Sequence, residues 1–134
     1  MVVSAARMKE SHIQRDIRAK LGELRLPFFR YQVGTFIAPD GSMVKIGVEG
    51  VSDLIGIIPY TVRPEDVGRT IGVFAALEVK KPNGAIRKAQ GPFLHMVNRI
   101  GGIAAIVRSP EDAAMVAAEM WDCELVKKYT DKPL

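Results

Sequence analysis

The sequence is short of cysteine, long apolar runs and repetitive segments. Its one cysteine, Cys123, cannot form an internal disulfide, which excludes a disulfide framework and favours plain packing for this residue. No apolar run approaches the length of a membrane span, and the first residues lack the apolar stretch of a secretory signal. Internal repeats, low-complexity tracts and linkers are missing too. We therefore expect a soluble, cytoplasmic protein that forms one domain, residues 1–134.

What is present is the composition of an ordinary globular domain. The 134 residues are 48% hydrophobic and 25% charged, which allows one real core and argues against global disorder. Nineteen Lys and Arg residues against fifteen Asp and Glu residues give a formal charge of +4. The sequence pI of about 9.4 modestly favours an anionic partner such as nucleic acid.

The first part of the chain predicts an amphipathic helix that begins at about Ser4 or Met8 and ends at Leu24. Its apolar stripe consists of Ile13, Ile17, Leu21 and Leu24, at spacings of four, four and three. Extended back towards the N-terminus, the stripe reaches Glu10, so this carboxylate is expected to face the core side. Alternatively, residues 11–14 form a capping box and leave Glu10 just outside the helix, as a favourable charge for the helix dipole. The sequence alone leaves both positions open.

Three strands are expected next. Alternating apolar and polar residues predict a half-buried strand over 28–37. The turn residues 39–42 then predict a hairpin that returns the chain through a second strand over 43–46. A third strand is predicted over 52–58.

An exposed excursion and a buried strand follow. Residues 59–70 hold two prolines, a glycine and four charges, which is typical of an exposed connection, and Glu65 and Asp66 are expected to be solvated there. Residues 71–80 are apolar on both faces, as in a central strand covered on each side. We expect this strand to be the middle of the sheet.

The last third of the chain predicts a helix, a strand and a helix. The first helix covers about 86–100 and closes at the glycines 101–102, although Gly91–Pro92 is an alternative start. A short apolar strand is predicted over 103–107, and a serine–proline N-cap signature predicts a last helix from 109 to about 125. The order of elements is that of a mixed α/β domain.

One group of charged residues lies in otherwise apolar segments. In an extended strand Glu78 and Lys80 point to one side and Val79 to the other, and burying either charge is unfavourable unless it has a partner or a task. Asp53 also lies in an apolar stretch, and two carboxylates that converge with a backbone carbonyl suit a hard cation such as Mg²⁺. An isolated Glu-x-Lys is more often a salt bridge within a sheet. Further residues of the pattern are therefore needed to distinguish a metal site from a salt bridge.

Together these segments resemble the VRR-NUC domains of the PD-(D/E)xK nuclease superfamily, especially the small stand-alone versions found in phages. The elements that carry the resemblance are Glu10-x-x-Ile13-Gln14, Arg30-Tyr31-Gln32-Val33-Gly34, Gly50-x-Ser52-Asp53-Leu54, Glu78-Val79-Lys80, Gln90 with Phe93, and Gly101-Gly102 before Val107-Arg108-Ser109-Pro110-Glu111-Asp112. The agreement of all of them in this order is specific. One departure is Ser52, which stands where the family usually has a proline.

The resemblance implies a restriction-endonuclease-like αβββαβ core, with a central mixed sheet flanked by helices and an additional C-terminal helix. It also implies metal-dependent hydrolysis of a DNA phosphodiester. Asp53, Glu78 and the backbone carbonyl of Val79 would ligate Mg²⁺ or Mn²⁺, and Lys80 would position the attacking water and stabilise charge on the phosphoryl group.

Further roles follow from the same resemblance. Glu10 would hold a metal-bound water or support a second ion, and Gln90 would orient Lys80 or a phosphate oxygen. Four basic residues near these positions are candidates for DNA phosphate contacts, although a solvated basic face is nearly as plausible. They are Arg30, Lys81, Arg87 and Lys88.

The resemblance also implies branched DNA such as four-way junctions as the substrate. We expect a homodimer to cut it, because a two-fold symmetric junction calls for two active sites. For a phage-encoded protein, the expected compartment is the host cytoplasm. One alternative is a catalytically silent DNA-binding module of the same fold, although Glu10, Asp53, Glu78 and Lys80 are all present. A further alternative is a restriction-type nuclease that reads a short sequence.

Overall fold

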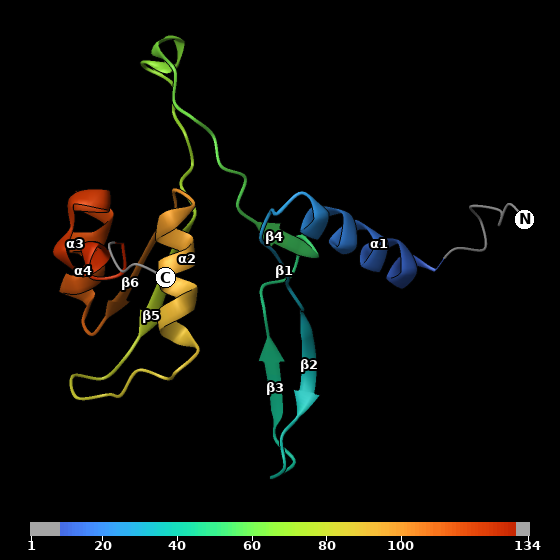
Figure 1. Ribbon diagram of the computed structural model, residues 1–134. Helices are drawn as coiled ribbons and strands as arrows, with labels where there is room; N and C mark the ends of the chain where they lie inside the picture. The colour runs from blue at the N-terminus through green and yellow to red at the C-terminus, as the bar shows by residue number, and fades with distance from the viewer. Residues whose placement is uncertain (1–8, 131–134) are drawn as a thin grey trace, which may run out of the picture. The chain divides into compact units, whose positions relative to one another are not determined.

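The computed structural model describes residues 9–130 and divides the chain into two compact units, the first ending at Ile58 and the second starting at Pro59. Helices and strands follow one another along both units (Figure 1), which confirms the mixed α/β class. In chain order the elements are α1 (Glu10–Glu23), β1 (Phe28–Arg30), β2 (Gly34–Ile37), β3 (Met43–Ile46), β4 (Leu54–Gly56), η2 (Pro64–Asp66), β5 (Ala75–Val79), α2 (Gln90–Arg99), β6 (Ile103–Val107), α3 (Pro110–Glu119), η3 (Met120–Asp122) and α4 (Glu124–Lys127). No helix among these residues is long and apolar enough to span a membrane.

In the first unit, α1 begins at Glu10. Its N-cap residue is Lys9, which makes no side-chain capping bond, so the alternative with a capping box at residues 11–14 is wrong. The predicted start at Ser4 or Met8 lies outside the described residues. The apolar stripe of α1 is not buried as expected: Ile13 and Ile17 are exposed, because the described elements of this unit do not cover the stripe.

The strand predicted over 28–37 is divided in two. β1 pairs with β4 in antiparallel register, with Arg30 opposite Leu54, whereas β2 pairs with β3. Between them the Tyr31 amide donates to the Asp53 carbonyl over 2.8 Å, and the Tyr31 hydroxyl accepts from the Val48 amide over 2.8 Å. The chain therefore changes partner at Tyr31, which is why one continuous strand does not form and why the strands of this unit pair two by two.

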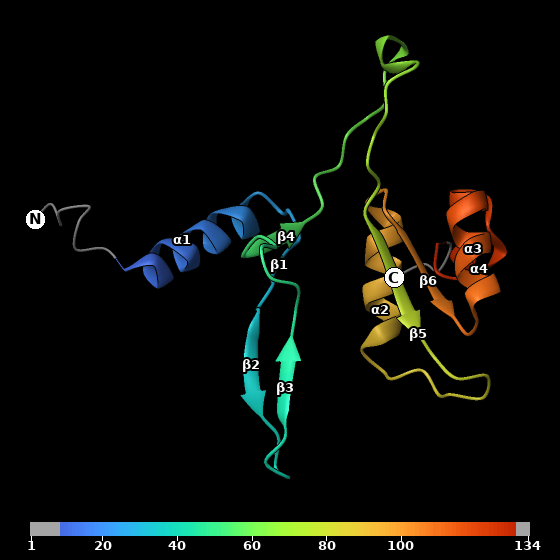
Figure 2. The same ribbon diagram turned by 180° about the vertical axis from the view of Figure 1, so that it is seen from behind.

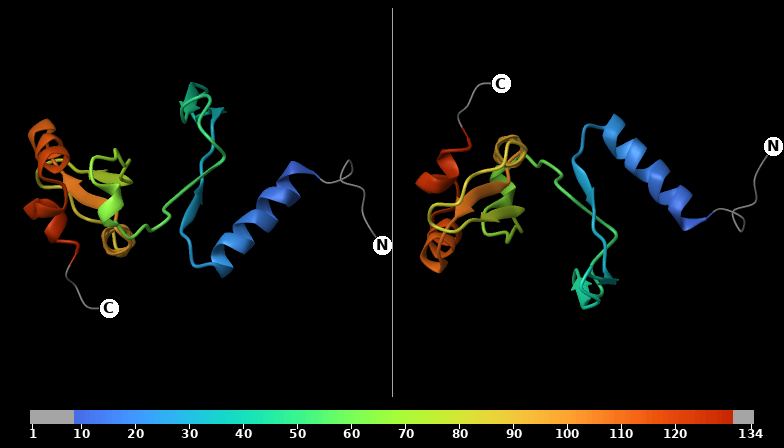
Figure 3. Two further views of the ribbon diagram at one scale, coloured as in Figure 1. Left: turned by 90° about the horizontal axis from the view of Figure 1, so that it is seen from above. Right: turned by 90° about the horizontal axis from the view of Figure 1, so that it is seen from below.

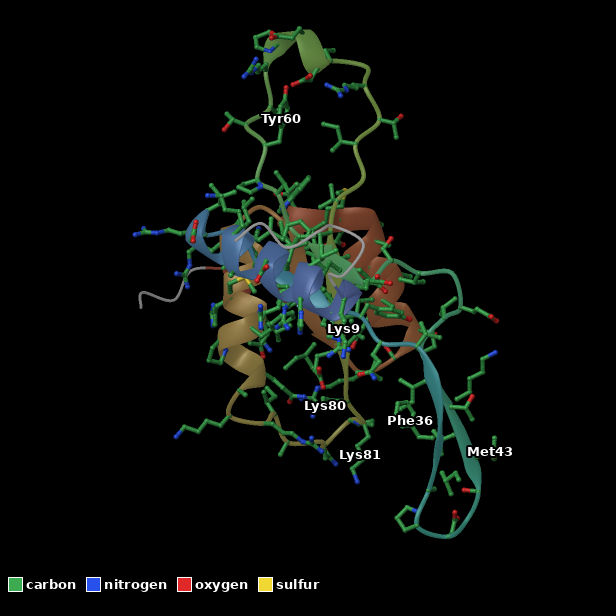
Figure 4. The ribbon with its side chains drawn as sticks, turned by 90° about the vertical axis from the view of Figure 1, so that its right-hand side faces the viewer. Lys9, Phe36, Met43, Tyr60, Lys80 and Lys81 are labelled. Atoms are coloured by element: carbon green, nitrogen blue, oxygen red, sulfur yellow. The ribbon has the colours of Figure 1, made fainter. Side chains whose placement is uncertain are left out.

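The hairpin turn forms as predicted. Asp40 accepts hydrogen bonds from the amide and hydroxyl of Ser42, over 2.9 and 2.6 Å, and these bonds lower the pKa of the Asp40 carboxyl. Gly41 has a φ of +85°, which a glycine adopts without strain. Phe36 and Met43 lie on the two strands of this hairpin (Figure 4).

The second unit is built on a parallel ladder of β5 and β6. Helix α2 lies on one face of the ladder, and α3 and α4 lie on the other (Figures 2 and 3). Every residue of β6 is buried, and Cys123 packs as expected in the core cluster beside it. The prediction that residues 71–80 form the covered central strand is wrong. β5 is shorter and alternates between half-buried and exposed residues, and the strand with both faces covered is β6.

Asn98 joins three elements of this core. Its side-chain amide donates to the carbonyls of Ala104 in β6 and Val126 in α4, over 3.0 and 3.1 Å, and its oxygen accepts from the Ala104 amide. A buried amide satisfied in this way fixes how α2 and α4 meet the ladder. The helix α2 starts at Gln90, later than residue 86, and Gly101 closes it with a φ of +101°.

The last predicted helix is interrupted. Ser109 caps α3 as expected, because its hydroxyl accepts from the Asp112 amide over 3.1 Å. The helix ends at Glu119 and does not continue to residue 125, since Met120 has a φ of +53°. The chain then forms η3 and α4, and Cys123 between them and Val126 in α4 belong to the core.

The excursion over 59–70 contains a buried carboxylate, which corrects the expectation that Asp66 is solvated. The Asp66 side chain is 3% exposed and accepts from the Arg63 amide over 2.9 Å and from Arg69 Nη1 over 3.1 Å. Tyr60, whose side chain points toward η2 (Figure 4), also donates to it. These bonds lower the pKa of Asp66, and the bond from the Arg63 amide has the largest effect. The hydrogen bond between Tyr60 and Asp66 also raises the pKa of Tyr60.

Candidate active site

Glu78 and Lys80 lie on the half-buried face of the chain through β5, the face that meets α2. Ala76, Glu78 and Lys80 are half-buried, whereas the Val79 side chain on the opposite face is exposed. The predicted alternation is therefore confirmed. The Lys80 amide donates to the Val107 carbonyl over 3.0 Å, so the ladder extends as far as this lysine.

Glu78, Lys80 and Gln90 form one polar cluster. The Lys80 ammonium lies 3.5 Å from Glu78 Oε1, and the two side chains are 14% and 32% exposed, respectively. Gln90 Nε2 donates to the same Glu78 oxygen over 2.5 Å, and Gln90 Oε1 accepts from the Arg87 amide over 2.8 Å. Gln90 thus contacts Glu78, whereas the sequence pointed to Lys80 or a phosphate oxygen as its partner.

This cluster is the ion pair that an isolated Glu-x-Lys pattern would also form, but it has two additional features. Both charges are largely removed from solvent, and Glu78 is held by a second side chain from the start of α2. A largely buried lysine paired with a carboxylate is suited to orienting a water or a phosphate oxygen.

In the first unit, Glu10 and Asp53 line one pocket of about 420 Å³. Asp53 directly precedes β4, and its carbonyl accepts the Tyr31 amide at the end of the β1–β4 ladder. Glu10 lies in the first turn of α1, and Arg30 lies at the end of β1 and lines the same pocket. The helix therefore brings the predicted Glu10 carboxylate to the same pocket as Asp53.

Four further residues of α1 line that pocket, and the sequence analysis assigned none of them to the site. They are Ser11, Gln14, Arg15 and Arg18. Helical spacing would have indicated two of these residues, because Gln14 and Arg18 follow Glu10 by four and eight positions and share its face.

The four predicted DNA-contact residues are all exposed. Arg30 belongs to the first unit, and Lys81, Arg87 and Lys88 belong to the segment between β5 and α2. Their charges are accessible to a phosphate backbone, which is the property that such contacts need. Their role stays a prediction.

The donor set fits a hard divalent cation in its chemistry. In the first unit Glu10 and Asp53 supply carboxylate oxygens, and in the second unit Glu78 and the Val79 carbonyl supply oxygens, the ligand type that Mg²⁺ and Mn²⁺ prefer. Among residues 9–130, no group of three or more His, Cys, Asp or Glu side chains forms a ready cluster. Backbone carbonyls and water would therefore complete the coordination in each case.

Comparison with known proteins agrees with this chemistry. A mixed α/β fold with an acidic and lysine-containing cluster is compatible with a phosphodiester hydrolase. The family model described as the VRR-NUC domain matches residues 37–111, more than half of the 134 residues. The chain belongs to the VRR-NUC family, which is a family of nucleases. The match includes Asp53, Glu78, Lys80 and Gln90 and leaves out Glu10. No curated protein and no solved structure matches the chain significantly.

Proposed function

We propose that the protein is a divalent-metal-dependent endodeoxyribonuclease. The observation that carries the proposal is the Glu78–Lys80–Gln90 cluster, which lies inside the region matched by the nuclease family. Nucleases of this kind use divalent metals, and we propose Mg²⁺ or Mn²⁺ as the ions, held by Asp53, Glu78 and the Val79 carbonyl. The bound ion would supply Lewis-acid stabilisation of the phosphoryl charge.

The protein's own groups have distinct roles in this proposal. Lys80 orients the attacking water and stabilises negative charge on the phosphoryl oxygens. Gln90 holds the Glu78 carboxylate through the observed hydrogen bond, so that one oxygen keeps a fixed direction. Glu10 holds a water or supports a second ion, and Arg30, Lys81, Arg87 and Lys88 neutralise DNA phosphates.

The central experiment is a cleavage assay on labelled four-way junction, flap and linear duplex with Mg²⁺ or Mn²⁺. We expect cutting that a chelator stops, and a loss of about 10²- to 10³-fold for Lys80→Met and Asp53→Asn. Lys45→Met and Asp122→Asn change exposed residues of the same types and serve as controls. Cutting that survives the chelator, or full activity in both site variants, would refute the mechanism. Junction binding without any cutting would establish the silent DNA-binding module instead.

We further propose that the preferred substrate is branched DNA and that the active form is a homodimer. A two-fold symmetric junction is cut at two related positions, and one chain supplies one set of catalytic residues. Sedimentation should show a dimer, and the junction should be cut symmetrically and faster than the linear duplex. A monomer that cuts symmetrically would exclude the dimer. Cleavage of the linear duplex at one defined sequence would favour a restriction-type enzyme.

A further inference from the structure

Arg108 directly follows β6, at the carboxyl end of the parallel ladder. Val107 is the last residue of β6, and its carbonyl accepts the amide of Lys80 over 3.0 Å. Because β5 and β6 are parallel, their carboxyl ends lie at the same edge of the ladder. Arg108 therefore lies next to the segment that follows Lys80. Figure 4 labels Lys80 and Lys81 at this exit.

The Arg108 guanidinium contacts backbone carbonyls of the turn that follows Lys80. Its Nη1 atom donates to the carbonyl of Lys81 over 2.7 Å and to those of Pro82 and Gly84 over 3.2 Å. The Gly84 amide donates to the Lys81 carbonyl over 2.8 Å, which closes the turn. One side chain therefore contacts three of the four carbonyls of this β-turn.

The backbone of Arg108 is fixed as well. Its amide donates to Asp112 Oδ2 over 2.8 Å, and the Asp112 amide donates to the Ser109 hydroxyl over 3.1 Å. The capped start of α3 thus holds the base of the arginine side chain. Within residues 9–130, the guanidinium makes no salt bridge to a carboxylate, so its hydrogen bonds go to the turn.

The position of the segment over 81–89 is set by hydrogen bonds, because its side chains are not buried in the core. Every residue of this segment except Gly84 is exposed, and Gly84 is half-buried. Arg108 holds the start of the segment, and Gln90 holds the Arg87 amide near its end. A segment with no fully buried residue depends strongly on such hydrogen bonds for its position.

We propose that Arg108 is a positioning residue for Lys80. It fixes the peptide that follows the lysine and thereby fixes the direction of the lysine side chain during DNA cleavage. This inference rests on the proposed nuclease function. Because a displacement of about 1 Å at a reacting group costs roughly 10²-fold in rate, loss of this anchor should act mainly on the chemical step.

The experiment compares Arg108→Met with Arg108→Lys and with Arg99→Met, which removes an equal charge from an exposed arginine at the end of α2. Three quantities are measured: the single-turnover rate at saturating junction DNA, the Kd for the same DNA in Ca²⁺, and amide hydrogen exchange over residues 80–84. A thermal melt of each variant shows that it folds.

We expect Arg108→Met to slow the single-turnover rate about 10- to 100-fold, to change Kd by less than about threefold and to speed exchange of the Gly84 amide. Arg108→Lys keeps a donor and should restore part of the rate, and Arg99→Met should match the wild type. If Arg108 instead contacted a DNA phosphate, Arg108→Met would weaken DNA binding and lower the salt dependence of log Kd by about 0.9, while the single-turnover rate stayed unchanged. That result would overturn the proposal.

The exchange measurement separates this proposal from the proposed function. If the wild type cuts no DNA, the nuclease proposal fails, and the positioning of Lys80 for cleavage fails with it. Faster Gly84 exchange in Arg108→Met would still support the anchored turn. Unchanged exchange in an active enzyme would overturn the role of Arg108 while the nuclease function stands.

Discussion

The two units position their candidate site residues by different means. In the second unit, Glu78, Lys80 and Gln90 lie on a ladder and a helix that pack into a buried core around β6. In the described part of the first unit, Ile57 is the one buried apolar residue, and Glu10 and Asp53 lie on elements held mainly by backbone hydrogen bonds. A cluster supported by packed side chains is fixed more firmly than one supported by short ladders.

The same difference explains why the candidate residues of the two units differ in their surroundings. The charges of the second unit already contact one another and are largely removed from water. Those of the first unit line an open pocket together with three arginines. The lysine–glutamate cluster is thus preorganised by its own unit, whereas the Glu10–Asp53 pocket is defined chiefly by where α1 and β4 are placed.

The largest expected effect tests the difference in burial. Leu94→Ala in α2 removes a side chain that is 2% exposed and should lower the free energy of unfolding by about 2–5 kcal/mol. Ile37→Ala in β2 removes one that is 76% exposed and should change it by less than about 0.5 kcal/mol. Urea unfolding measures both. A cost for Ile37→Ala equal to that of Leu94→Ala would show that the hairpin is covered in solution and would break the comparison.

The second prediction concerns the pocket of the first unit. Glu10→Gln removes a carboxylate that faces the same pocket as Asp53 and should lower metal-dependent cleavage about 10- to 100-fold with an unchanged melting temperature. Glu23→Gln, at the other end of α1, is the matched control, because its exposed pair with Lys20 adds little stability. Equal activity of the two variants would remove Glu10 from the site.

The third prediction identifies the least tolerant position of the first unit. A Cβ atom at Gly56 would overlap the ring of Phe28, its partner in the β1–β4 register. Gly56→Ala should therefore destabilise this ladder by about 1–3 kcal/mol, measured by thermal unfolding. Gly22→Ala in α1 meets no atom within 4 Å and should be neutral or slightly stabilising. A tolerated Gly56→Ala would mean that the ladder contributes little to the first unit.

The smallest expected effect is local and lies in the excursion over 59–70. The pKa of Asp66 is lowered from 3.8, so its stabilising bonds are fully present above that pH and are lost as the pH falls through the lowered pKa. Amide exchange over 63–69 should rise only in strong acid, and Asp66→Asn should raise it at neutral pH. An Asp66 carboxyl that titrates at or above 3.8 by NMR would contradict the buried network.

Several elements could be predicted from the sequence because short-range patterns specify them. The Asp40–Ser42 turn, the Ser109 cap and the opposite faces of Glu78 and Val79 all depend on residues within four positions of one another. The family resemblance rested on such local motifs, and the family match confirmed it.

Other features depended on partners far along the chain. The break after β1 arises because Tyr31 bonds to Asp53 and Val48, and the buried strand proved to be β6, since α2, α3 and α4 cover it. The sequence around Asp66 is that of a solvated loop, but in the structure this carboxylate accepts hydrogen bonds from the Arg63 amide and the Arg69 guanidinium and is buried.

The sequence by itself determined the residue types of the site and the α/β class, because periodicity and spacing are properties of the chain alone, and its motifs carried the resemblance to the nuclease family. Only the tertiary structure decided that Gln90 holds Glu78, that Glu10 shares a pocket with Asp53 and that Arg108 holds the turn after Lys80. These contacts join residues between 12 and 43 positions apart, and whether such residues meet depends on how the elements pack, which no local pattern specifies.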